Sequence, residues 1–354
     1  MNKKNRMYSL PYNGTDVDWF LQEAEKRKKN IDHIFLDIPL PVGIPRSRDM
    51  FCHVENVNSY NRMYNHVMSC VDLLKKSKGN FRRLCTLNAM YYPYQNAGDF
   101  FSFIQDVCDV IVQYAIDGVI VTDYRVARAI HKKLPEVDIQ TSCNGYQWNT
   151  TQMEIWRETC GTTTFNPPRE ILRSFSKLKE MHDMGFRLKC LVNEACLMGC
   201  PNTFNHSLSI ALRCLGTLDN CCQRGIGDIL RANYILPRWQ KYYDEYVDVY
   251  KISGRESKKD YPFFALDAYL REENSIPLSA LMHGGTMAQF KKNVPVEIRK
   301  KLTLDKIPDK LMTCECKNCK QCGLCEKIAK TYIPKEYWDK FYAVDYGRYF
   351  KENR

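Results

Sequence analysis

The chain has 354 residues, with 52 Lys and Arg against 41 Asp and Glu, and a formal net charge of +11 at pH 7. This length allows one large hydrophobic core and suits a single large barrel with an appendage. No apolar run reaches the roughly 18 residues of a membrane helix, and the basic N-terminus lacks the apolar core of a signal peptide. We therefore expect a cytoplasmic protein without membrane insertion.

The positive charge is concentrated near the C-terminus. Residues 286–354 contain 16 Lys and Arg against 9 Asp and Glu, a local excess of +7, so the first 285 residues carry only +4. A mildly basic surface is the simpler interpretation. The alternative is a basic, Tyr-rich tail that lies near a phosphate-bearing substrate. The charge thus permits RNA as a partner but does not require it.

Eight apolar segments rich in Val, Ile and Leu alternate with segments of helical period, such as the stripe formed by Phe100, Ile104, Val107 and Ile111. Strands that alternate with helices are typical of a parallel sheet. The pattern predicts an α/β protein in which residues 1–285 form a (β/α)8 barrel and residues 286–354 form a Cys-rich appendage. The predicted strands are residues 7–13, 33–39, 82–89, 117–123, 137–144, 162–167, 187–194 and 247–253.

The predicted strands end in polar residues. In a (β/α)8 barrel, functional groups lie at these C-terminal strand ends. Asn and Asp also favour turns, which explains part of the pattern. Five Asn at equivalent ends nevertheless indicate a hydrogen-bonding cup. The residues concerned are Asn13, Asp37, Asn88, Asp123, Asn144, Asn166, Asn193 with Glu194, and 251–255.

Seventeen cysteines in a chain without an export signal indicate metal or cluster binding rather than disulfides. Isolated cysteines, such as Cys70, Cys85 and Cys160, are expected in the hydrophobic core. Most of the others fall in two short windows, residues 190–222 and 314–325. We expect each window to bind a metal centre.

The first window follows the seventh predicted strand, on the face where a cofactor could meet a substrate. The spacing Cys-x₃-Cys-Pro suits a loop that holds a [4Fe-4S] cluster on four thiolates. Two alternatives remain open, a structural zinc site of three Cys with His206, and buried thiols without metal. The expected cluster ligands are Cys196, Cys200, Cys221 and Cys222, with Cys190 and Cys214 as substitutes.

The second window holds five cysteines in twelve residues, namely Cys314, Cys316, Cys319, Cys322 and Cys325. The last four stand at two-residue gaps and resemble a ferredoxin run, in which the fourth Cys follows after three residues. Two successive Cys-x₂-Cys pairs also suit zinc. Zinc, the preferred interpretation, would stabilise a tail with little apolar area; a second iron–sulfur cluster would provide an electron relay.

Three segments resemble the collagenase-like peptidase family U32: residues 136–144, residues 193–201 with two cysteines, and residues 228–255 with their Lys-Ile-Ser-Gly-Arg ending. The resemblance implies a TIM-barrel-like domain with a [4Fe-4S] cluster on four Cys. It also implies oxygen-independent hydroxylation, which family members perform on ubiquinone precursors or RNA bases with prephenate as oxygen donor. A few members are described as peptidases. The Cys spacing and Arg231, where Lys is common, depart from the hydroxylating branches, so no particular substrate is carried over.

The first functional hypothesis is iron–sulfur-dependent hydroxylation, or a related modification, of a small anionic or nucleotide-bearing substrate. Lys251 and Arg255 would bind the anion, and Glu194 would act as acid or base. Asn144 and Asn193 would orient the substrate, together with Asn88 and Asn166.

The second hypothesis is a peptidase with a Cys nucleophile and His206 as its partner. The chain lacks the His-Glu-x-x-His and Gly-x-Ser-x-Gly motifs of other hydrolases. The third hypothesis is a non-catalytic cluster protein whose partner is a redox donor or a sister subunit. Tail aromatics such as Tyr337 and Trp338 would then form a docking surface, or they would simply pack onto the barrel.

Overall fold

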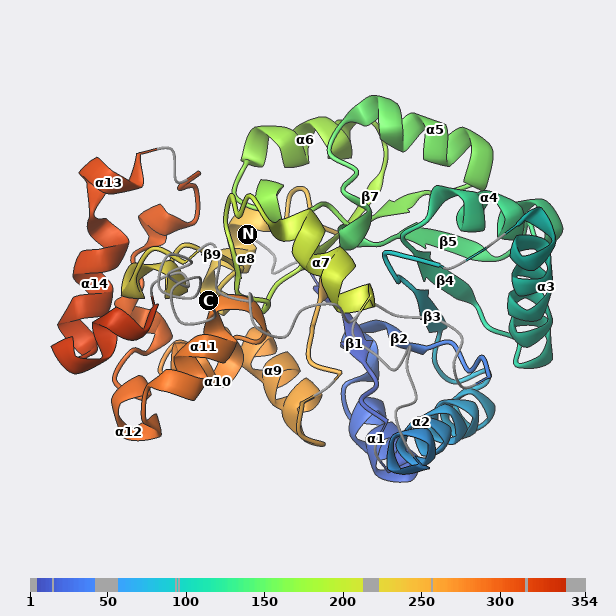
Figure 1. The fold of residues 1–354 in the computed structure, drawn as a ribbon, viewed down its shortest axis with the longest axis horizontal. Coiled ribbons are helices and arrows are strands. Elements are labelled where there is room, and N and C mark those ends of the chain that lie inside the picture. Colours follow the sequence, from blue (N-terminus) through green and yellow to red (C-terminus); the bar gives the residue numbers. More distant parts are fainter. Residues whose placement is uncertain are drawn as a thin grey trace, which may run out of the picture.

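A computed structural model describes residues 5–14, 16–41, 57–92, 94, 96–212, 223–255, 257–315 and 318–341. The strands of its main sheet are β1 (Met7–Pro11), β2 (Ile31–Asp37), β3 (Arg83–Leu87), β4 (Gly118–Val121), β5 (Asp138–Thr141), β6 (Thr164–Phe165), β7 (Arg187–Leu191) and β10 (Val249–Lys251). They form a closed parallel barrel in the order β1-β10-β7-β6-β5-β4-β3-β2 (Figure 1). The predicted (β/α)8 barrel is confirmed, and each predicted strand overlaps one barrel strand.

Helices surround the barrel (Figure 1). The predicted stripe lies on α3, where Ile104, Val107 and Ile111 are buried. The first helix begins where Asp16 accepts a hydrogen bond from Trp19 N at 3.1 Å, a usual N-cap. The helices are α1 (Val17–Glu25), α2 (Val57–Lys76), α3 (Ala97–Gln113), α4 (Tyr124–Lys133), α5 (Thr150–Cys160), α6 (Phe175–Asp183), α7 (Thr203–Leu212), α8 (Gln240–Tyr243), α9 (Tyr261–Leu270), α10 (Leu278–Leu281), α11 (Gly285–Asn293), α12 (Val296–Arg299), α13 (Cys319–Cys322) and α14 (Leu324–Tyr332).

Shorter elements complete the connections. Two short strands, β8 (Cys196–Leu197) and β9 (Ala232–Asn233), form a separate antiparallel pair beside the barrel. The 3₁₀ helices are η1 (Lys28–Asn30), η2 (Cys143–Gly145), η3 (Arg169–Ile171), η4 (Ile226–Ile229), η5 (Pro237–Trp239), η6 (Leu304–Lys306), η7 (Asp309–Leu311) and η8 (Lys335–Phe341). None of the helices in the described residues is both long and apolar enough to cross a membrane.

The inside of the barrel is polar. Barrel interiors are usually filled by bulky apolar side chains, but here only Phe35, Leu84 and Ile120 form a small apolar cluster apart from the main core. Lys189 is fully buried in this interior, where its Nζ donates to Gln140 Oε1 and lies 3.4 Å from His33 Nε2. Burial and the nearby Lys251 hold the pKa of Lys189 well below its ordinary value. The interior therefore favours a neutral amine at this position.

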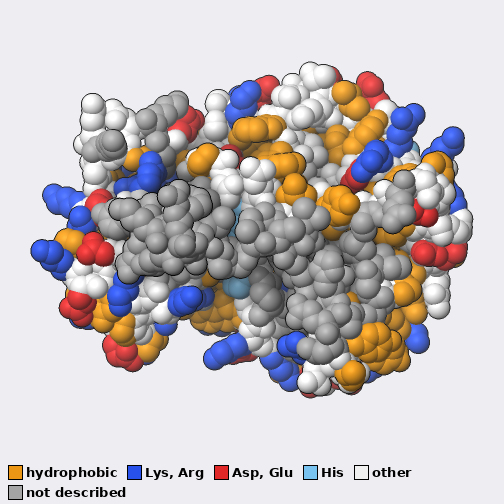
Figure 2. All heavy atoms as spheres, in the orientation of Figure 1, with side chains coloured by type: hydrophobic (Ala, Val, Ile, Leu, Met, Phe, Trp, Pro, Cys, Tyr) orange, Lys and Arg blue, Asp and Glu red, His pale blue; other side chains and the backbone are white. Residues whose placement is uncertain are grey.

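The C-terminal segment packs against the barrel from α11 onward (Figure 1). Thr286, where the predicted appendage begins, is buried and donates through Oγ1 to Ala195 O at 2.9 Å. Phe341 is buried with its ring 6.1 Å from that of Phe290, and Trp338 Nε1 donates to Ile333 O at 2.8 Å. The described tail aromatics thus pack inward. Among the coloured side chains of Figure 2, acidic and basic groups lie side by side over this end of the molecule.

A network of ion pairs stabilises the barrel near the place where β1 pairs with β10. Arg6 precedes β1 and donates from Nη2 to Asp244 Oδ2 at 2.8 Å and from Nη1 to Glu272 Oε1 at 2.6 Å. Tyr250 of β10 donates to the same Asp244 at 2.7 Å. This network links the chain start to the ends of α8 and α9.

We expect Arg6→Met to lower the free energy of unfolding by about 2 kcal/mol, because Asp244 and Glu272 lose a charged donor in a half-buried site. Urea unfolding followed by circular dichroism measures this change. Lys179→Met is the matched control, because it removes the exposed Lys179–Asp183 pair and should change the midpoint little. Equal changes in the free energy of unfolding for the two variants would contradict the proposed role of the Arg6 network.

Candidate active site

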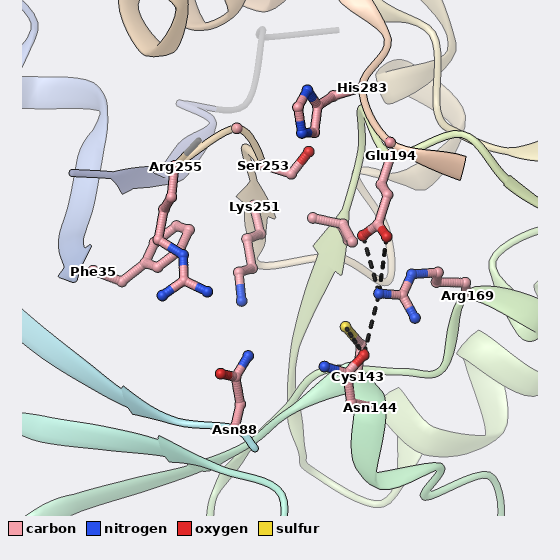
Figure 3. Close-up of a pocket in the computed structure, with 13 residues that line it drawn as sticks. Phe35, Asn88, Cys143, Asn144, Arg169, Glu194, Lys251, Ser253, Arg255 and His283 are labelled. Carbon is pink, nitrogen blue, oxygen red and sulfur yellow. Dashed lines mark hydrogen bonds and ion pairs between the residues drawn. The ribbon is translucent and has the colours of Figure 1, made fainter. Parts of the chain in front are cut away.

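A polar pocket opens at the C-terminal ends of the barrel strands (Figure 3). It offers about 80 Å³ of space, enough for several water molecules or a small substrate. Active sites of (β/α)8 barrels lie at this end. The lining residues are Phe35, Asn88, Cys143, Asn144, Arg169, Leu191, Glu194, Lys251, Ser253, Gly254, Arg255, His283 and Gly284.

One wall of the pocket is built around Glu194, which follows β7. Arg169 Nη2 lies 3.0 Å from each carboxylate oxygen of Glu194 and also donates to Asn144 Oδ1 at 3.1 Å (Figure 3). The Sγ of Cys196 donates to Glu194 Oε1 at 3.1 Å. Arg169 is only 3% exposed, so this pair is shielded from water. Loops after β5, β6 and β7 are therefore joined through the guanidinium of Arg169.

The opposite wall carries two further cations. Lys251, at the end of β10, places its Nζ 4.6 Å from the centre of the Phe35 ring, and the Arg255 guanidinium lies 5.8 Å from the same ring. Arg255 is paired with Asp37 and donates to Thr86 Oγ1 at 2.9 Å. Both head groups point towards Asn88, whose Oδ1 is buried without a hydrogen-bond partner in the described part of the chain (Figure 3).

The pKa of Lys251 is lowered to about 8. Burial is the main cause, and Arg255 and Arg169 add to it, while Cys143 and Glu194 oppose it. No carboxylate forms an ion pair with this ammonium among the described residues. Lys251 can therefore gain or lose a proton near neutral pH.

Three predicted site residues, namely Asn166, Asn193 and His206, lie outside the pocket lining. Asn193 has a supporting role, because its Oδ1 accepts from Ser253 N at 2.7 Å and its Nδ2 donates to Tyr261 Oη at 2.9 Å. His206 lies on α7, and it is absent from the lining of the pocket that the described residues form. Asn144, Glu194, Lys251 and Arg255 do come together there as predicted.

Three pocket residues were not singled out from the sequence as site residues. Cys143 and Arg169 follow β5 and β6 directly, so strand-end position alone could have identified them. His283 has no such signal, since it returns to the rim from beyond α10 through a bridge to Glu194. Next to it, Gly285 has a φ of +47°, and a Cβ there would lie 2.2 Å from Ala195 O. Only glycine allows this close return.

The predicted barrel cluster has two of its four expected ligands in the described residues. Cys196 lies in β8 and Cys200 follows the turn after it, and both are partly accessible. Cys221 and Cys222, like the substitute Cys214, lie outside the described residues. Cys190 is not a suitable substitute, because its neighbours Lys189 and Leu191 face the barrel interior and it therefore faces the helices. Burial also raises the pKa of its thiol.

The second cysteine window lies apart from this pocket. Cys314, Cys319, Cys322 and Cys325 line one hollow together with Arg231, while Cys316 lies outside the described residues. Within the described parts of the chain, no three Cys, His, Asp or Glu side chains are arranged to hold a single metal ion.

The fold and the pocket define a (β/α)8 barrel protein with a buried, cation-rich site at the catalytic end. The model of Peptidase family U32 matches residues 60–200. An uncharacterized protease, MJ1657, from Methanocaldococcus jannaschii is 25% identical over 254 residues, which cover 67% of this chain and 72% of that protein. The resemblance to family U32 is thereby confirmed. The solved structure of the U32 peptidase Mk0906 aligns with a TM-score of 0.48 and 10% identity, over 72% of this chain and 94% of that one.

We expect anion binding in the pocket to weaken as pH rises through about 8, because Lys251 loses its charge there. Sulfate is a suitable probe, since its own charge is constant in this range. If binding requires the ammonium, its affinity should fall by roughly thirtyfold between pH 6.5 and pH 9.5, measured by calorimetry. Lys251→Arg should remove the dependence, whereas Lys251→Met should bind weakly throughout. A wild-type affinity that is constant over this range would contradict the assignment.

Proposed function

We propose that the chain is an iron–sulfur-dependent barrel enzyme that modifies a small anionic substrate, by oxygen-independent hydroxylation or a related reaction. The observation that carries this proposal is the charge of the pocket. Arg169, Lys251 and Arg255 line it; Glu194 pairs with Arg169 and Asp37 pairs with Arg255, which leaves Lys251 without an ion-pair partner among the described residues. Buried charges without compensation are costly, so such a site favours a ligand that brings negative charge.

Some pocket residues are suited to substrate binding and others to proton transfer. Lys251 and Arg255 bind the anionic group of the substrate, and Asn88 offers an Oδ1 atom that still needs a donor. Glu194 is held in place by Arg169 and faces the pocket, where it can act as acid or base. Lys251, with a pKa of about 8, can supply or accept a second proton.

A [4Fe-4S] cluster would be held by Cys196 and Cys200 with Cys221 and Cys222, and would supply one-electron chemistry next to the pocket. The hydrogen bond from Cys196 to Glu194 places this loop against the pocket wall. A nucleotide-bearing substrate would extend beyond the small pocket. One-electron chemistry would also need a redox donor as partner.

Anaerobically purified protein should be brown, and the double variant Cys196→Ser, Cys200→Ser should lose about four irons per chain. Cys143→Ser should keep them, because Cys143 is not an expected ligand. Iron analysis and absorption spectra measure both. Unchanged iron in the double variant would exclude this cluster site.

Substrate binding is tested with prephenate, the oxygen donor of hydroxylating relatives. We expect calorimetry under anaerobic conditions to show binding, and Lys251→Met to weaken it at least tenfold, or about 1.4 kcal/mol. Lys177→Met, which changes an exposed ammonium far from the strand ends, should leave it unchanged. If protein that contains the cluster does not bind prephenate, hydroxylation with prephenate as oxygen donor is excluded.

A peptidase remains the second candidate, because Cys143 lies in the pocket beside cationic side chains. Its thiol lines the same pocket as Lys251 and Arg169, and a Cys side chain in such a pocket is a candidate nucleophile. The other nucleophile-like arrangement, Ser9 with His33 at 2.7 Å and Asp32 beyond it at 2.6 Å, reproduces a catalytic triad. Ser9 and His33 are fully buried in the barrel, so no substrate reaches them.

If the chain is a Cys143 peptidase, hydrolysis of a gelatin substrate should survive complete removal of iron and disappear in Cys143→Ala. Iodoacetamide should modify Cys143, and the modification should abolish hydrolysis. Ser9→Ala should retain activity. Hydrolysis that is absent from the metal-free protein, or that persists in Cys143→Ala, would rule out this candidate.

A further inference from the structure

Four C-terminal cysteines line one hollow, although they lie on different short helices and turns. Cys314 follows η7, Cys319 and Cys322 lie on α13, and Cys325 lies in the first turn of α14. Residues three apart on a helix share a face, which directs Cys319 and Cys322 to the same side. Gly323, with a φ of +58°, ends α13 and turns the chain so that Cys325 joins them.

The hollow has a volume of about 100 Å³, and all four cysteines line it. Cys325 is buried, Cys314 and Cys319 are half-buried and Cys322 is exposed, so the hollow is open to solvent on one side. Four thiols that line one hollow are placed as the ligands of a four-cysteine metal site would be. We infer that Cys314, Cys319, Cys322 and Cys325 form a four-thiolate site for an iron–sulfur cluster, separate from the barrel site.

The size of the hollow favours a cluster over a single zinc ion. Zinc draws four sulfurs to about 2.3 Å from one centre, which closes the space between them. In a [4Fe-4S] centre, irons and sulfides lie between the thiolates, so the ligands stand further apart around a larger volume. In the described part of the chain, all four cysteines line one hollow of about 100 Å³.

Two buried arginines from the barrel face this site. Arg231 lines the hollow, and its Nε has no hydrogen-bond partner among the described residues, although its Nη atoms pair with Asp228 and approach Glu326 at 3.7 Å. Arg173, only 2% exposed, places Nη1 3.5 Å from the Cys314 carbonyl oxygen. A four-thiolate cluster carries net negative charge, and buried cations beside it offset that charge.

The site is also held firmly against the barrel. Gly227 N, in η4, donates to Glu326 Oε2 at 2.9 Å, and a Cβ on Gly227 would lie 2.6 Å from that oxygen. The helix that carries Cys325 thus contacts η4, which begins four residues after Cys222.

Full-length protein purified anaerobically should contain about eight irons, four for each site. Cys314→Ser should reduce this to about four and remove part of the absorbance near 400 nm. Cys316→Ser is the matched control, because four thiolates already complete the site without it, and it should retain all the iron. Loss of iron in Cys316→Ser but not in Cys314→Ser would overturn the ligand assignment. One zinc per chain that disappears in Cys314→Ser would overturn the cluster assignment.

The two cluster sites can be tested independently. The variant Cys196→Ser, Cys200→Ser should lose the barrel iron and keep the C-terminal iron, so failure of the proposed function leaves this inference intact. Arg231→Met should keep four thiols but lower the reduction potential of the remaining cluster, measured by redox titration with electron paramagnetic resonance in that double variant. Circular dichroism checks that each variant is folded. A folded double variant without iron would overturn the inference.

Discussion

The ion pair between Glu194 and Arg169 is the interaction on which the catalytic end of the barrel depends. Arg169 follows β6 and Glu194 follows β7, and the same guanidinium reaches Asn144 after β5. The backbone of Glu194 bridges to His283, and its carboxylate accepts from Cys196. Because both charges are buried, loss of either would leave the other uncompensated. Three strand ends, the returning segment with His283 and the segment with Cys196 therefore keep their positions together.

Charge in the barrel is arranged in two levels. Near the strand starts, Lys189 is fully buried against Gln140 and His33, and burial followed by Lys189 itself lowers the pKa of His33 to about 3. At the strand ends, Lys251 and Arg255 meet an open pocket. An apolar layer of Phe35, Leu84 and Ile120 lies in the same interior. The cost of buried charge lowers the pKa of both lysines, that of Lys189 well below its ordinary value and that of Lys251 to about 8.

The barrel could be predicted from the sequence because buried parallel strands read as short apolar runs, and all eight were located. The same reasoning placed Glu194, Lys251 and Arg255 at the rim, since position at a strand end determines position in the pocket. It failed for Asn193, because a strand-end side chain can turn to brace a neighbouring loop. It also failed for His283, which reaches the pocket through a fold-back that depends on Gly285 and leaves no periodic signal. The alternation of β7 likewise directs Cys190 away from the pocket.

The C-terminal segment makes close contacts with the barrel around its cysteines. Its cysteines lie beside two arginines of the barrel, since Arg231 lines the same hollow and Arg173 donates to the Cys314 carbonyl oxygen. A side chain at position 227 would collide with Glu326. The close contact between α14 and η4 therefore depends on glycine at this position. The same η4 leads into β9, the strand that pairs with β8 and so with Cys196, whose Sγ donates to Glu194. The tail and the pocket wall at Glu194 are therefore connected through η4 and one short antiparallel pair of strands.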